Sequence, residues 1–111
     1  FMVVDKGDNP LNFVDPSGTA MFVYSIQRGV ELGLLKAKEY TPVAYRGYQS
    51  LFPFIQVNDR GLLDVIGACD GVVIKKNFVE YVTVPKILNA KEAVAGILWA
   101  AVIMETEQLK K

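Results

Sequence analysis

Apolar residues in the first third of the chain recur at intervals of three and four, the spacing of one face of a helix. Asp15 precedes this run as a candidate N-cap, and Pro16 stands at the first helical position, where its missing N–H costs nothing. Gly33 is a suitable stop, so the pattern predicts a helix over residues 16–33. Residues 1–14 are turn-rich and predicted to be irregular. The periodic apolar positions are Met21, Phe22, Val23, Ile26, Val30 and Leu34.

A second helix is predicted to begin at Thr41 and Pro42, where the same start signal recurs. Pro53 should end or kink this helix, because proline cannot donate a backbone hydrogen bond and clashes with the preceding turn. The apolar side chains that this helix would carry are Val43, Tyr45, Tyr48, Leu51 and Phe52.

The middle of the chain favours short extended segments. Residues 58–61 read as a turn, followed by a short strand at 62–66 and a second extended candidate at 72–74. Residues 78–84 are β-branched and aromatic, which is typical of a strand. Pro85 confines that strand to a sheet edge or to irregular extended backbone.

The last helix has the clearest start signal. Asn89 as N-cap and Glu92 three residues later form a variant of the capping box. Residues 93–104 are apolar nearly all round, which predicts that Leu98 and its neighbours are shielded on opposite sides by layers of helix. We expect most of these layers to lie outside this chain. The run is too short to cross a bilayer, and it ends at the polar Glu105.

Composition and charge narrow the classes of partner. With 111 residues, the chain is at most one domain, and 51% hydrophobic and 22% charged residues are ordinary for a globular protein. Twelve basic and twelve acidic residues cancel. Without a net field, the chain is not expected to bind nucleic acid or a membrane surface.

Missing residue types exclude several chemistries. The chain has no histidine, so neither a Ser-His nor a Cys-His nucleophile pair nor an imidazole metal site can be built from it. The single cysteine, Cys69, has no thiol partner for a disulfide or for zinc. We therefore expect no metal and no cofactor, and interpret Cys69 as a small buried or half-buried residue.

Three stretches of the chain resemble one enzyme family. Residues 15–35 are similar to its segment of an acidic residue, a small hydroxyl residue and an aromatic helix that ends at a glycine turn. Residues 40–48 are similar to its following helix, and residues 59–100 to its hairpin, cysteine-containing turn, tyrosine segment and final helix. Together they cover residues 13–108. In order and spacing they resemble the unsaturated rhamnogalacturonyl and unsaturated glucuronyl hydrolases, glycoside hydrolase families 105 and 88.

The resemblance implies a fold and a reaction. These enzymes form an (α/α)6 toroid of six helical hairpins. Residues 1–111 would be a single incomplete domain, the C-terminal part of that toroid, mainly α with about three helices plus a short β-hairpin or extended excursion. The family adds water across the C4–C5 double bond of the unsaturated uronic acid in pectin, rhamnogalacturonan or glycosaminoglycan oligosaccharides. An oligosaccharide is thus the implied partner of the parent enzyme.

The chain also departs from the family pattern. The catalytic aspartates of the family belong to earlier hairpins, and nothing here matches them, so we expect no catalytic residue and no activity from this chain alone. Asp15 replaces the usual Glu, and Pro16 replaces a hydroxyl residue. Where the final helix usually opens with Asp and two glycines, this chain has Ala90, Ala93 and Ala95. If those glycines let the backbone approach sugar, the added methyl groups would crowd it.

Candidate binding residues cluster at the start of the first helix. Ser17, Gly18 and Thr19 lie where free N–H groups favour an anion such as a uronate carboxylate. The alternative is that they are ordinary first-turn residues with good local hydrogen bonds. Asp15 could act as a general acid, but helix capping is the role its position favours.

Aromatic residues could stack on sugar rings, and Tyr81 is the best candidate because its segment is irregular and Glu80 beside it suggests exposure. Trp99 lies in the middle of an apolar helix, which favours core packing. Asp8 and Asp70 lie in turns and could face a cleft, but a surface turn is the expected setting for both. The remaining aromatic candidates are Tyr45, Tyr48 and Phe52.

A rival function is a non-catalytic helical domain for carbohydrate binding or assembly, which an aromatic content of 11% and an apolar final helix would suit equally. Both readings leave apolar faces uncovered. We therefore expect self-association of this chain.

Overall fold

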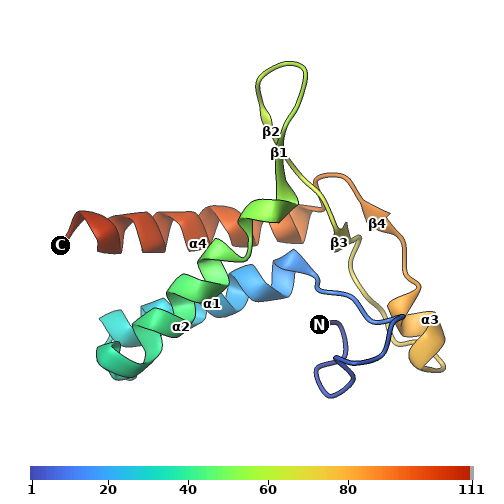
Figure 1. Ribbon diagram of the computed structural model, residues 1–111, viewed down its shortest axis with the longest axis horizontal. Coiled ribbons are helices and arrows are strands. Elements are labelled where there is room, and N and C mark those ends of the chain that lie inside the picture. The colour runs from blue at the N-terminus through green and yellow to red at the C-terminus, as the bar shows by residue number, and fades with distance from the viewer. Residues whose placement is uncertain (111) are drawn as a thin grey trace.

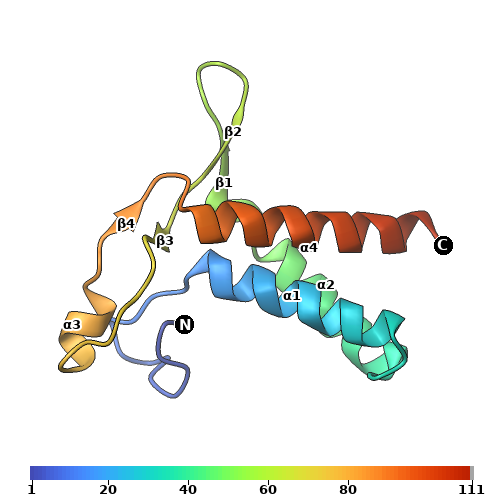
Figure 2. The same cartoon turned by 180° about the vertical axis from the view of Figure 1, so that it is seen from behind.

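The chain, described by a computed structural model over residues 1–110, is built around three long helices. They are α1 (Pro16–Glu31), α2 (Ala37–Gln49) and α4 (Lys91–Leu109). α1 and α4 run side by side in the same direction, and α2 returns along α1 (Figures 1 and 2). α1 therefore packs against both other helices and forms the centre of the assembly.

Small residues let the helices approach closely. A methyl group added at Gly96 of α4 would lie 3.2 Å from Ala20 Cβ, and one added at Gly47 of α2 would lie 2.7 Å from Val23 Cγ2. A methyl group at Gly47 would therefore overlap Val23, and one at Gly96 would push Ala20 aside by a few tenths of an ångström. The main apolar side chains of the shared core are Ala20, Val23, Ala44, Tyr48, Leu51, Ala93, Ile97, Ala100, Ile103 and Met104.

The first helix matches its prediction closely, but the second begins one turn earlier than predicted, at Ala37 rather than Thr41. The Lys36 carbonyl accepts hydrogen bonds from the amides of the two residues at 39 and 40, so the helix is already wound before Pro42. Good helix formers at 37–39 account for the early start. The helix then ends before Pro53 as predicted, in a 3-10 turn, η1 (Phe52–Phe54).

Two short antiparallel pairs connect α2 to α4. β1 (Ile55–Val57) pairs with β2 (Leu63–Val65) in a hairpin that projects from the helices (Figure 1). The predicted turn at 58–61 is confirmed, and Asn58 Oδ1 accepts hydrogen bonds of 3.0 Å from the amides of Arg60 and Leu62. β3 (Ala68–Cys69) pairs with β4 (Lys86–Ile87). Residues 72–74, the second extended candidate, form no strand.

The strand predicted over residues 78–84 is wrong, because this segment forms the short helix α3 (Phe78–Val82). Asn77 caps the helix: its side chain accepts a hydrogen bond of 3.0 Å from Glu80 N. Its backbone carbonyl accepts another from Tyr81 N. This local capping overrides the β propensity of the apolar residues.

The predicted N-cap of the last helix is also wrong, because Ala90 holds that position and makes no side-chain capping bond. Asn89 instead has a left-handed backbone, with φ of 55°. Its side-chain oxygen accepts from Val65 N at 2.7 Å, and its amide nitrogen donates to Asp64 Oδ1 at 2.9 Å. Asn89 N also donates to the Val65 carbonyl at 2.8 Å. Asn89 thus ties the start of α4 to the β1–β2 hairpin.

One face of α4 is uncovered in this chain. Leu98, Trp99 and Val102 are 59%, 62% and 67% exposed. The expectation of a core position for Trp99 is therefore wrong here, although one side of its ring packs on Tyr24 with centroids 5.1 Å apart. Residues 93–104 of α4 are apolar nearly all round, but the chain supplies partners for only one face. None of the helices within residues 1–110 is long and apolar enough to cross a membrane.

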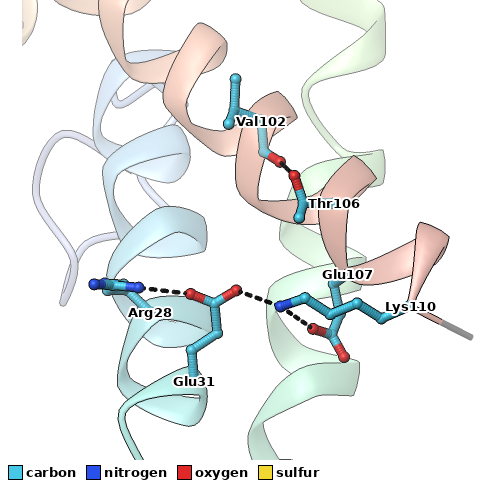
Figure 3. A network of polar contacts seen from close by, with 6 residues as sticks. All are labelled: Arg28, Glu31, Val102, Thr106, Glu107 and Lys110. Atoms are coloured by element: carbon cyan, nitrogen blue, oxygen red, sulfur yellow. Dashed lines mark hydrogen bonds and ion pairs between the residues drawn. The ribbon is translucent and has the colours of Figure 1, made fainter.

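An ionic cluster joins the far ends of α1 and α4 (Figure 3). Arg28 Nη1 lies 2.9 Å from Glu31 Oε2, and Lys110 Nζ lies 3.3 Å from Glu31 Oε1. Lys110 Nζ also lies 3.7 Å from Glu107 Oε2. Hydrogen bonds from Arg28 and Lys110 lower the pKa of Glu31 below its ordinary value. Such surface pairs contribute little stability.

Candidate functional site

Asp15 fixes the N-terminus of α1. It lies in extended backbone just before the helix, and its Oδ1 accepts a hydrogen bond of 2.8 Å from Ser17 N. The Ser17 hydroxyl donates to the same oxygen. The predicted N-cap is confirmed, and the local hydrogen bonding expected of an ordinary helix start is present. The first turn then presents Ser17, Gly18 and Thr19 in succession.

The same carboxylate also binds β3. Asp15 Oδ2 accepts from Cys69 N at 3.0 Å and from Cys69 Sγ at 3.1 Å. Burial raises the pKa of Asp15, but the hydrogen bonds from Ser17 and Cys69 outweigh burial and hold that pKa below its ordinary value of 3.8. Asp15 is therefore an ionised structural acceptor rather than a proton donor. No local pattern in the sequence signals the contact with Cys69.

Cys69 is buried, in agreement with the interpretation of a small buried residue. Burial raises the pKa of its thiol to about 11, and the hydrogen bond to Asp15 and the negative charge of Asp15 add to this effect. At neutral pH the thiol therefore stays protonated and donates a hydrogen bond. A thiol in this state is a poor nucleophile.

A cavity of about 370 Å³ opens beside this helix start. Figure 1 shows the N-terminal loop and α3 at the same end of the molecule as the start of α1. All four residues that the sequence singles out for substrate binding line the cavity. They come from two elements, α1 and α3, that are distant in sequence. The polar or small lining residues are Asp15, Ser17, Gly18, Thr19, Cys69, Gly71, Tyr81 and Glu92.

The chemistry of the cavity is mixed. Hydroxyl groups come from Ser17, Thr19 and Tyr81, and Met21 and Phe22 supply apolar wall. A Cβ built at Gly18 would meet nothing within 4 Å, so the backbone there borders open space. Apolar walls with a few convergent polar groups are the usual make-up of a small-molecule site.

A larger groove, of about 640 Å³, lies between the β1–β2 hairpin and the first half of α4. Its lining is almost wholly apolar, with Ile55, Leu63, Val94, Ile97 and Leu98 as the main contributors. Few polar groups converge there, so the smaller cavity is the better candidate for a polar ligand.

The other sequence candidates lie elsewhere. Asp8 is exposed, and Asp70 lines a different pocket together with Lys75. Both aspartates are thus surface turn residues, as expected. The other aromatic candidates for sugar stacking all lie outside this cavity; they are Tyr45, Tyr48, Phe52 and Trp99.

The three alanines that replace the Asp and the two glycines of the family pattern also stay out of the cavity. Ala90 and Ala93 are fully buried in the core, and Ala95 lines the apolar groove. Their methyl groups therefore do not crowd the cavity beside Ser17.

Glu92 is the cavity residue whose position the sequence did not reveal. Its spacing from Asn89 predicted only a helix start, and it does lie in the first turn of α4. That turn reaches the cavity because α4 packs along α1, which is a tertiary feature with no local signal. No group of three or more Cys, Asp or Glu side chains suited to hold a metal ion occurs within residues 1–110.

A match to a protein-family model shows to which family this chain belongs. The model described as Glycosyl Hydrolase Family 88 matches residues 2–108. This chain belongs to glycosyl hydrolase family 88. The resemblance noted in the sequence is thereby confirmed.

A solved structure gives the same relationship for this family 88 chain. It is a glycoside hydrolase from family 105 of C. acetobutylicum ATCC 824, with 27% sequence identity and a TM-score of 0.85. The match covers 94% of this chain but only 31% of that one. The expected fold class, a mainly α portion of a family 105-like helical toroid, is confirmed.

Proposed function

We propose that this family 88 chain forms part of the substrate cleft of an enzyme that hydrates the unsaturated uronic acid of pectin or glycosaminoglycan oligosaccharides. The observation that carries the proposal is the convergence of Ser17, Gly18, Thr19 and Tyr81 on one cavity. Family membership supports a carbohydrate ligand.

Each of the four residues has a distinct task in this proposal. The hydroxyls of Ser17 and Thr19 exchange hydrogen bonds with the sugar, and the ring of Tyr81 packs against one sugar face. Gly18 leaves room for the ligand to approach the backbone, because a side chain at this position would occupy open space.

The chain by itself should bind but not turn over substrate. It spans 31% of the matched hydrolase, and its radius of gyration of 15.2 Å exceeds that of a compact domain of this size, about 13 Å. The exposed face of α4 fits the same proposal, since further helices of a toroid would cover it.

Ultraviolet absorbance of the C4–C5 double bond tests whether the chain alone turns over substrate. The 111-residue chain incubated with an unsaturated uronyl disaccharide should leave the absorbance unchanged, whereas the full-length protein should abolish it. Robust turnover by the isolated chain would contradict the proposal that catalytic groups lie outside it.

Substitution of Tyr81 tests the cavity itself. In the full-length protein, Tyr81→Ala should raise KM about tenfold, because one sugar face loses its packing surface. Tyr45→Ala is the matched control, since Tyr45 is a partly exposed tyrosine of α2 outside this cavity. Equal effects of the two substitutions would remove the cavity from the substrate path.

A further inference from the structure

One face of α4 is an apolar stripe with an opposite charge at each end. The exposed residues of the helix recur at intervals of three and four, so they lie on one side of it. The side chain of Lys91 is 84% exposed at the start of the helix, and Glu105 is exposed toward its end. The exposed apolar residues between these two charges are Ala95, Leu98, Trp99 and Val102.

The stripe is symmetric about Leu98. Lys91 lies seven residues before Leu98, and Glu105 lies seven residues after it. Seven residues make about two turns of helix, so all three side chains lie on one line along α4. A second α4 placed antiparallel over Leu98 therefore brings its own Glu105 opposite Lys91 and its own Lys91 opposite Glu105. In a parallel pair, like charges would meet and repel at both ends.

Both charged groups are available for such a contact. Tyr48 OH donates to Glu105 Oε1 at 2.9 Å, which fixes the carboxylate to α2 and leaves Oε2 to face a cation. Burial and the contact with Glu105 raise the pKa of Tyr48 to about 12, so the hydroxyl stays protonated and keeps donating. Lys91 Nζ lies 4.0 Å from Glu92 Oε1, which is too far for a hydrogen bond.

The apolar groove beside the β1–β2 hairpin gives the second helix room. An antiparallel α4 centred on Leu98 sets its Val102 opposite Val94, and Val94 lines this groove of about 640 Å³. The second half of α4 extends away from the hairpin of its own chain, with α1 and α2 on one side of it (Figures 1 and 2). In the antiparallel pair, the hairpin of each copy would flank that second half in the other copy.

We infer that two copies of this chain pair through α4 in an antiparallel, two-fold arrangement, with Leu98 at the axis and Lys91 of each copy opposite Glu105 of the other. Because the pair is two-fold, each contact occurs twice. α4 gains an antiparallel helix over its open face, as α1 has in α2 (Figure 1). The cavity beside Ser17 takes no part, so the inference is independent of the proposed function.

Charge reversal tests the direction and the register of the pair. Lys91→Glu and Glu105→Lys each turn both ion pairs of the dimer into like-charge pairs. Each should therefore raise the dissociation constant of the 111-residue chain about tenfold, as measured by sedimentation equilibrium at low salt. The double variant with both substitutions restores opposite charges and should return the dissociation constant close to the wild-type value.

Loss of folding does not explain such a result. An acidic residue at the start of a helix and a basic residue toward its end both interact favourably with the helix dipole, so neither reversal weakens α4 through its charge. Glu105→Gln is a milder variant, because its amide oxygen can still accept from Tyr48 while the charge is lost. It should raise the dissociation constant about threefold.

Mixing the two single variants separates this pairing from non-specific apolar association. Copies with Lys91→Glu have two acidic ends, and copies with Glu105→Lys have two basic ends. Each variant disfavours its own kind but complements the other, so an equimolar mixture should form heterodimers about as tightly as the wild-type chain forms homodimers. Association driven by apolar contact alone predicts no recovery on mixing.

Lys38→Glu is the matched control, since it makes the same charge change at an exposed lysine in the first turn of α2, outside the stripe. Its dissociation constant should equal that of the wild-type chain. Single reversals without effect, or a mixture that does not recover, would overturn the inference. A 111-residue chain that stays monomeric would overturn it too, and would assign the stripe to further helices of a longer protein while the proposed function stands.

Discussion

Two buried polar side chains, one at the N-cap of α1 and one within the helix, differ in whether they have hydrogen-bond partners. Asp15 is engaged at both carboxylate oxygens, by Ser17 and by Cys69. Gln27 is 0% exposed, and neither its Oε1 nor its Nε2 has a partner in the part of the chain that the structure describes. An amide removed from water without replacement bonds is destabilising, so Gln27 is a weak point of the core.

Gln27→Met should therefore stabilise the chain by about 1 kcal/mol, because methionine keeps a similar volume and leaves no polar atom unpaired. Urea denaturation measures the free energy of unfolding. Gln49→Met on the exposed face of α2 is the control and should change it by less than about 0.5 kcal/mol. A loss of stability in Gln27→Met would show that the amide has a partner after all.

Asp15→Asn tests the charged cap. The amide presents donors to the Cys69 groups that now donate to Asp15, so stability at pH 7 should fall by about 1–2 kcal/mol. The folded-state pKa of Asp15 lies below the ordinary 3.8, so its contribution is complete above pH 3.8 and is lost as the pH falls through the folded-state pKa. Denaturation curves of both proteins should therefore converge in acid; a constant difference would contradict the ionised cap.

At the scale of elements, Asn89 couples α4 to the β1–β2 hairpin through backbone and side chain together. Its φ of 55° is unfavourable for most residues, and its side chain bridges Val65 N and Asp64 Oδ1. Asn89 thus positions the start of α4 relative to the β1–β2 hairpin.

Two substitutions separate these contributions. Asn89→Gly keeps the left-handed backbone but loses the side-chain bonds, and should cost about 1–2 kcal/mol. Asn89→Ala loses both and should cost about 1 kcal/mol more. Chemical denaturation of the pair gives the order. Equal stability of the two variants would mean that the backbone conformation carries no strain.

The sequence was informative where structure is decided locally. The start of α1 follows from Asp15 and Pro16, and the hairpin turn from residues 58–61, because caps and turns act within a few residues. The sequence was misleading where two local signals compete or where the structure depends on a residue far away in the chain. Capping by Asn77 makes a segment of high β propensity the helix α3, and Asn89 does not cap α4 because its side-chain oxygen accepts a hydrogen bond from Val65 N.

The residues of the candidate site also divide into those that a local sequence signal indicated and one that it did not. Ser17, Gly18 and Thr19 could be named from a helix start. Tyr81 was chosen because its segment was expected to be irregular; that segment is the helix α3, but the structure still places all four residues around one cavity. Glu92 could not be named, because its place depends on how α4 packs along α1.

At the scale of the whole molecule, the uncovered face of α4 determines whether copies of the chain associate. Leu98, Trp99 and Val102 form an exposed apolar patch on one helix. A patch of this kind marks a surface that another protein surface covers. When the chain is isolated, the protein surface available to cover this patch is that of a second copy of the chain.

We therefore predict that the isolated 111-residue chain self-associates through this face. The double substitution Leu98→Lys and Val102→Lys should raise the dissociation constant at least about tenfold, as measured by sedimentation equilibrium. Leu34→Lys, at an exposed leucine after α1, is the control and should leave it unchanged. A wild-type chain that stays monomeric at high concentration would exclude the interface.

The ionic cluster of Figure 3 has a consequence for how the two ends of the molecule respond to their surroundings. α1 is 16 residues long, so Arg28 and Glu31 lie about 20 Å from the helix start, more than two Debye lengths at physiological ionic strength. The end that carries the cavity is thus electrostatically independent of the ionic cluster. High salt should weaken the exposed ion pairs at the distal tips of α1 and α4, whereas the buried hydrogen bonds that Cys69 donates to the Asp15 carboxylate are screened much less.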